Sequence, residues 1–139
     1  MKNLLIAALI VLLLATELFS HSLEKPEKVY SIITKMFPVE WYETQAKLWK
    51  NELKGNIKNG TAWQNYYEAN RMCRMLGSEK WSTKKEPWFE PLDTIINHLQ
   101  INLPDSYEFN YLTYRNSGLN FDSFKYLEKA YKINPERTD

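Results

Sequence analysis

The stretch Tyr126–Glu136, with the sequence YLEKAYKINPE, carries the most informative pattern in this chain. Its apolar residues recur at steps of three and four, as they do on one face of an α-helix. Proline cannot continue a helix, so the Asn134-Pro135 pair ends this one, and Asp122 is placed to cap its start. We therefore predict a helix from about residue 122 to residue 133. Its predicted apolar face comprises Phe124, Leu127, Ala130 and Tyr131.

The preceding segment has the signals of another helix. Asp105 and Glu108 stand at the spacing of a capping box, in which the first side chain accepts from a backbone amide and the second reaches back to the cap. Asn116, Ser117 and Gly118 end this helix, because residues of these types favour turns. The link to the final helix is short, and a short link makes two consecutive helices lie antiparallel.

Three more helices are predicted farther upstream, over residues 39–54, 61–76 and about 88–100. Gly55 and Gly77 stand at the ends of the first two. No long stretch of alternating apolar and polar residues competes with this pattern, so strands are not expected. The predicted fold class is all-α, with antiparallel helix hairpins stacked on one another.

The last two predicted helices also match a known repeat pattern. Counted from Pro104 as the first position, an aromatic residue stands fourth, a small residue twentieth and a proline thirty-second. The matching residues are Tyr107, Ser123, Leu127, Ala130 and Pro135. This segment, up to about Arg137, resembles one tetratricopeptide repeat, although Tyr111 stands where that family normally has a small residue. A weaker match to the same pattern upstream extends the resemblance over roughly residues 39–137. The resemblance implies a short tetratricopeptide-like array. The alternative is a plain helical bundle.

The resemblance implies a binding groove, because the first helices of successive repeats line the concave face of such arrays. Carried over position by position, the groove residues are Gln64, Glu68, Arg71, Glu108, Arg115 and Asn116, with Thr61, Met72, Asp105 and Leu112 beside them. Arg71 and Arg115 fall at equivalent positions, so we expect the two guanidinium groups to hold a peptide carboxylate. The alternative is that both arginines are solvated and pair with Glu68 or neighbouring acids.

The first 22 residues read as a signal peptide. Lys2 gives a positive start, and Leu4–Leu14 is an unbroken apolar run that is shorter than the roughly 20 residues a spanning helix needs. Small residues place cleavage after Ser22 or after Ser20. We expect an exported protein, periplasmic or secreted, with no stable membrane span after cleavage. Residues 23–38 are expected to be a linker or a short N-terminal segment before a helical domain over residues 39–139; the alternative for the apolar run is an uncleaved anchor.

Composition excludes several classes of protein. The 139 residues have a formal net charge of +1, which gives no bulk electrostatic reason to bind nucleic acid. One cysteine and two histidines are too few for a disulfide framework or a zinc cluster, and Cys73 is expected to be a buried small apolar residue. His98 has no serine motif or second histidine near it in the sequence, so we expect no enzyme, no metal and no cofactor.

The expected function is therefore that of a non-enzymatic scaffold that binds a protein or a peptide. Since repeat arrays end in a capping helix, and only four residues follow Pro135, we expect the outer side of the last hairpin, with Tyr114 and Tyr131, to meet a partner or a second copy. The alternative is a small-molecule or glycan binder that uses exposed tryptophans as stacking surfaces. The residues concerned are Trp63, Trp81 and Trp88.

Overall fold

The computed structural model describes residues 24–30, 35–80, 86–118 and 120–137. The predicted signal peptide, residues 1–22, lies outside these ranges, and so does Trp81. Within them the regular structure is helical and no β-strand occurs, so the all-α prediction is confirmed. None of the described helices is both long enough and apolar enough to cross a membrane.

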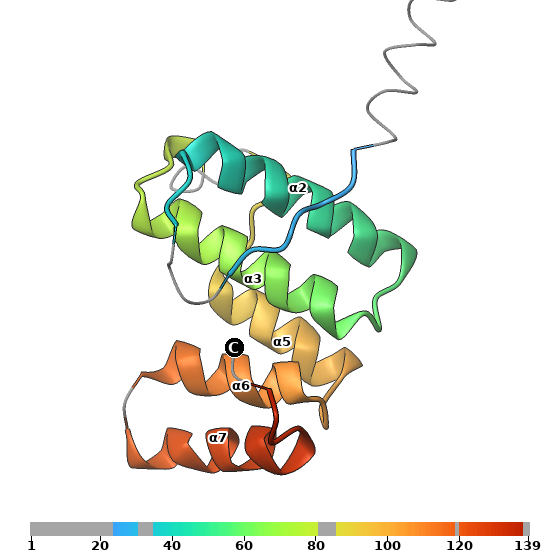
Figure 1. The fold of residues 1–139 in the computed structure, drawn as a ribbon, viewed down its shortest axis with the longest axis vertical. Helices are drawn as coiled ribbons and strands as arrows, with labels where there is room; N and C mark the ends of the chain where they lie inside the picture. Colours follow the sequence, from blue (N-terminus) through green and yellow to red (C-terminus); the bar gives the residue numbers. More distant parts are fainter. Residues whose placement is uncertain (1–23, 31–34, 81–85, 119, 138–139) are drawn as a thin grey trace, which may run out of the picture.

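The helices follow one another along the long axis of the molecule, as Figure 1 shows. At one end, α2 (Val39–Gly55) and α3 (Gly60–Met75) form an antiparallel hairpin, and at the other end α6 (Tyr107–Ser117) and α7 (Phe121–Ile133) form a second one. Between them lies α5 (Leu92–Asn102), which packs against both α3 and α6. The two hairpins also touch directly, because α3 contacts α6.

The core is centred on α3, which is covered by α2, α5 and α6. Several of its side chains have no exposed surface, among them Tyr66, Met72 and Cys73. Aromatic side chains bury large areas, so a small domain gains much of its stability from few of them. The prediction that Cys73 is a buried apolar residue is confirmed.

A segment without regular structure, residues 24–30, lies across the first hairpin (blue in Figure 1). The amide of Val29 donates to Oδ1 of Asn65 on α3 at 2.6 Å, and Val29 itself is buried. Nε1 of Trp49 on α2 donates to the carbonyl oxygen of Glu27 at 2.8 Å. This part of the expected linker therefore packs on the domain through its backbone.

Two predicted helix starts are wrong by one or two residues. The N-cap of α6 is Ser106 and not Asp105, because the Ser106 hydroxyl accepts from the amide of Phe109 at 3.0 Å. The N-cap of α7 is Asn120 and not Asp122, and it forms a capping box with Ser123. In both places a second residue with a short polar side chain stands nearby, and serine and asparagine cap helices as well as aspartate does.

The helix predicted from residue 88 begins later, at Leu92. Pro91 is its N-cap and has ψ of 144°, which is an extended and not a helical backbone. Trp88 and Phe89 therefore precede α5, and their rings stack at a centroid distance of 4.1 Å. Both are buried against the core.

The predicted apolar face of α7 is divided between two sides of the helix. Ser123 and Ala130 are buried, which agrees with the close packing of α7 on α6. Phe124 and Tyr131, in contrast, are exposed. The predicted apolar face is therefore only partly buried, whereas the exposed position of Tyr131 agrees with its expected place on the outer side of the last hairpin.

Candidate binding site

Glu68 lies in the middle of α3 and has no exposed surface, although it is a charged residue type. Its Oε2 accepts from Nε of Arg71 at 2.8 Å, one turn farther along the same helix. Its Oε1 accepts from Nη1 of Arg115, which comes from α6. Glu68 thus joins two arginines from two helices, and we refer to these three residues as the Glu68 cluster.

The Glu68 cluster balances a buried acid against two cations. Burial raises the pKa of the Glu68 carboxyl above its ordinary value, and the charges of Arg115 and Arg71 act in the opposite direction. Each arginine side chain keeps about a fifth of its surface exposed, at 20% for Arg115 and 19% for Arg71. The ion pairs therefore lie at the edge of the interface, where the guanidinium groups retain contact with water while the carboxylate does not.

A second polar group lies near the start of α3 and contains Arg137, which follows α7. Nη1 of Arg137 donates to Oε1 of Glu108 at 2.7 Å, and Nη2 donates to Oε1 of Gln64. The guanidinium carbon lies 4.4 Å from the centre of the Tyr107 ring. We call Gln64, Tyr107, Glu108 and Arg137 the tail cluster, since it attaches the tail after α7 to α3 and α6.

Asn116, near the end of α6, joins the same interface on the side away from the tail. Its Nδ2 donates to Oδ1 of Asp93 at 2.5 Å, and its Oδ1 accepts from the Tyr67 hydroxyl at 3.3 Å. Burial raises the pKa of Tyr67 to about 12, with the Glu68 carboxylate acting in the same direction. The tyrosine therefore stays protonated and acts as a donor over the whole physiological range of pH.

The six residues expected to line a groove all lie along the contact between α3 and α6, but they bond within the chain. The arginines expected to hold a peptide carboxylate already bind the carboxylate of Glu68. Gln64 and Glu108 both bind Arg137. The alternative of pairing with Glu68 describes the contacts better, except that this carboxylate is buried and not solvated. Sequence reasoning missed the roles of Tyr107 and Arg137.

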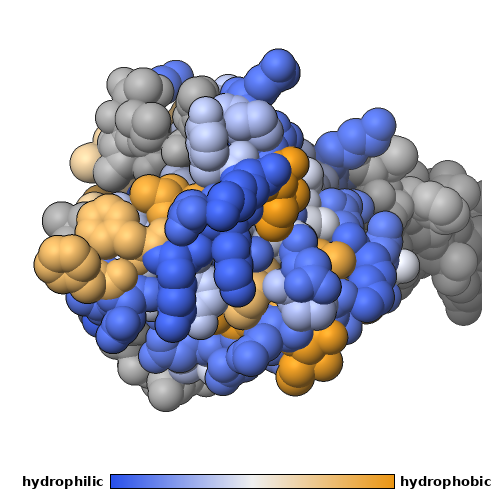
Figure 2. Space-filling view, turned by 90° about the horizontal axis from the view of Figure 1, so that it is seen from below, coloured by the Kyte–Doolittle hydropathy of each residue, from blue (hydrophilic) through white to orange (hydrophobic). Residues whose placement is uncertain are grey.

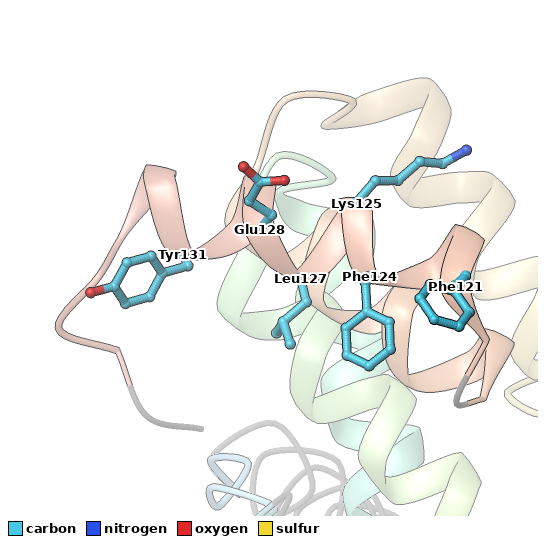
Figure 3. A pocket seen from close by; sticks show the side chains of 6 residues that line it. All are labelled: Phe121, Phe124, Lys125, Leu127, Glu128 and Tyr131. Atoms are coloured by element: carbon cyan, nitrogen blue, oxygen red, sulfur yellow. The ribbon is translucent and has the colours of Figure 1, made fainter.

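A different surface is left open on α7. Four apolar side chains, Phe121, Phe124, Leu127 and Tyr131, border a shallow hollow together with Lys125 and Glu128. Figure 3 shows the first three projecting from one side of the helix, with Lys125 and Glu128 on the other side. We call these four apolar residues the α7 stripe.

The α7 stripe is unusually exposed for its residue types. Phe121 exposes 97% of its surface, Tyr131 63% and Phe124 47%. Phe121 is the first residue of α7, directly after the Asn120 cap, so the cap fixes its position at the end of the hairpin. In Figure 2, which views the molecule from the α7 end, apolar side chains stand among hydrophilic ones on this face.

Trp63 and Trp88 do not offer the stacking surfaces that a glycan binder needs. Trp63 is buried, its Nε1 donates to the carbonyl oxygen of Ile57 at 2.8 Å, and its ring stacks on His98. Trp88 is buried against Phe89. The alternative in which Trp63 and Trp88 are exposed is therefore wrong, because both rings fill the core.

His98 lies on α5 with 42% of its side chain exposed. Its ring stacks on Trp63 at a centroid distance of 5.6 Å, and its Nε2 lies 3.8 Å from Oε2 of Glu90. The other oxygen of Glu90 accepts from Nζ of Lys50.

Within the described part of the chain, no group of three or more metal-ligating side chains is found.

Comparisons of the chain with protein-family models, with curated proteins and with solved structures find no match. The function is therefore inferred from the chain's own residues.

Proposed function

We propose that this chain is an exported, non-enzymatic helical-repeat scaffold that binds another polypeptide through the α7 stripe. The observation that carries the proposal is the exposure of Phe121, Phe124 and Tyr131 side by side on one helix. Burial of apolar surface away from water is favourable by about 25 cal/mol of free energy for each Å². Contiguous apolar side chains on a surface are accordingly typical of protein-binding sites.

The residues around the stripe indicate the chemistry of the partner. Lys125 and Glu128 border the hollow with one positive and one negative charge. A partner with a large net charge of either sign therefore gains little electrostatic attraction from them. A helix with an apolar face and mixed charges along its edges fits best, since a helix presents side chains at the same three- and four-residue spacing as α7. Such a helix would come from another protein or from a second copy of this chain.

The order of helix contacts supports the repeat part of the proposal. In stacked hairpin arrays the first helix of one unit contacts its own second helix and the first helix of the next unit. In the repeat pattern, α3 stands as the first helix of a unit, α5 as its second helix and α6 as the first helix of the next unit. In agreement with this, α3 contacts α5 and α6, and α6 contacts α7. Ser123 and Ala130, which stand at the small positions of the tetratricopeptide pattern, are both buried.

The proposal is tested by selecting, from displayed helical peptides, those that bind the immobilised protein. The position at which the selected peptides bind is then mapped. Hydrogen exchange of the complex is expected to show protection over residues 121–131, while α2 is unchanged. The selected peptides are expected to be amphipathic helices. Sedimentation of the protein alone determines whether a second copy is the occupant. A selection that enriches no peptide, or protection that spares α7, would contradict the proposal.

A further inference from the structure

We infer that Gln64, Tyr107 and Glu108 form a recognition site for an arginine side chain, which Arg137 occupies from within the same chain. The inference goes beyond the proposed function, because it names a second binding surface and the kind of side chain that this surface takes. It concerns the surface between α3 and α6, whereas the proposed function rests on α7. The two surfaces can therefore be tested separately.

The contacts of Arg137 match the three recognition features of a guanidinium group. Its two terminal nitrogens donate to different acceptors, Oε1 of Glu108 and Oε1 of Gln64. Its guanidinium carbon lies over the Tyr107 ring at 4.4 Å. A guanidinium group presents several donors in one plane and stacks on aromatic rings, whereas a lysine ammonium is a point charge. The site therefore selects arginine over lysine.

Burial makes these contacts favourable. The Glu108 side chain is 13% exposed and Gln64 is buried, so both acceptors are largely removed from water. Charge-assisted hydrogen bonds are stronger in such surroundings than on an open surface. If Arg137 leaves, the Glu108 carboxylate and the Gln64 amide oxygen each lose a hydrogen bond from a charged donor, which is unfavourable. The vacated site then favours the entry of another cation of the same shape.

The backbone of α3 leaves room for the acidic side of the site. A Cβ atom added to Gly60 would stand 2.6 Å from Cδ of Glu108, which is closer than atoms pack. Glycine at the start of α3 thus makes the space in which the Glu108 carboxylate lies. Alanine at this position would push the Glu108 carboxylate aside, so Gly60 is a positioning residue for the site.

The occupying residue is held by a short tail. Arg137 lies four residues after Ile133, the end of α7, and its amide donates to the carbonyl oxygen of Asn134 at 3.4 Å. A peptide with the same sequence offers the same side chain from solution. The apparent affinity of such a peptide is reduced by the fraction of molecules in which Arg137 already fills the site.

The test titrates the peptide INPERTD, which copies residues 133–139, into labelled protein and follows amide NMR shifts. Wild type is compared with Arg137→Ala and Arg137→Gln, the second of which keeps most of the side-chain volume. If Arg137 fills the site about nine-tenths of the time, both variants bind the peptide about tenfold more tightly than wild type. The shifts are expected around residues 60–64 and 107–108. A control peptide with alanine in place of arginine is expected to cause none of them.

Further variants in the Arg137→Ala background separate this inference from the proposed function. Glu108→Gln and Gly60→Ala are expected to weaken binding of the arginine peptide, whereas Phe121→Ser with Phe124→Ser leaves it unchanged. Equal binding of the arginine and alanine peptides, or no shift in either Arg137 variant, would overturn the inference and leave the α7 proposal standing. Arginine-dependent binding together with a failed selection on α7 would support the inference and contradict the α7 proposal.

Discussion

Arg115 of α6 donates a hydrogen bond to the carboxylate of Glu68, which lies 47 residues earlier in the middle of α3. This ion pair joins the two helix hairpins at a point where the acid is fully buried. Removal of either partner leaves a charge with less compensation, so the pair is a direct test of how the hairpins are held together.

Arg115→Ala is expected to lower the free energy of unfolding by about 2 kcal/mol at neutral pH, which is typical of a lost hydrogen bond to a charged group. Urea unfolding followed by circular dichroism measures the change. Lys132→Ala is the matched control, because Lys132 pairs with Glu128 on the open surface of α7 and both side chains are more than half exposed. Equal stability of Arg115→Ala and wild type would show that the two hairpins do not depend on this pair.

The pH dependence of stability follows from the raised pKa of Glu68. In the folded protein this carboxyl holds its proton more tightly than in the unfolded chain, whose ordinary pKa is 4.5. Its contribution to stability is therefore complete below that value and is lost as the pH rises through the folded-state pKa. The Glu68→Gln variant cannot titrate at this position. The stability of wild type minus that of the variant should fall as the pH rises above about 4.5, and a rise would contradict the burial of an acid here.

Several features of the fold follow from short stretches of sequence. The end of α6 was predictable from Asn116–Gly118, and Gly118 has φ of 72°, a conformation that glycine adopts without strain. The start of α7 was less predictable, because Asn120 and Asp122 are both good caps and only the final register of the helix selects one. Local chemistry thus predicted the existence of each helix more accurately than its first residue.

Which side of each helix is buried depends on contacts between residues that are distant in sequence. Periodicity placed Phe124 and Tyr131 on an apolar face but carried no information on what covers that face. In the same way Arg137 meets Gln64, 73 residues away, although nothing near either residue indicates a partner. The tetratricopeptide resemblance predicted equivalent positions for Arg71 and Arg115, whereas their shared acid became clear only from the packing of α3 on α6.

Cys73 should resist modification in the folded protein. Burial raises the pKa of its thiol to about 12, so almost no thiolate exists at pH 8, and the side chain has no exposed surface. Because the chain has one cysteine, a reagent whose absorbance changes when it reacts with a thiol reports on Cys73 alone. We expect no reaction at pH 8 in buffer and one equivalent after unfolding in urea. Full labelling of the native protein would contradict the buried position.

If the chain is exported as proposed, the mature protein has a defined N-terminus. Expression of the full chain in a bacterial host, followed by mass spectrometry of the envelope and culture fractions, should yield a protein that begins at Leu23, or at His21 if cleavage follows Ser20. Replacement of Leu9 by Arg interrupts the apolar run and is expected to leave the uncleaved chain in the cell. A mature protein that still begins at Met1 would contradict cleavage.

The affinity of a selected peptide for three proteins tests most directly whether the α7 stripe binds a polypeptide. Phe121→Ser with Phe124→Ser removes two exposed rings from α7, while Ile101→Ser removes an apolar side chain that is 75% exposed on α5. Truncation of aromatic anchors at a binding site commonly costs more than 1 kcal/mol each, so the double variant should bind at least about tenfold more weakly than wild type. Ile101→Ser should bind as wild type does. Equal affinity of all three proteins would contradict binding through the α7 stripe.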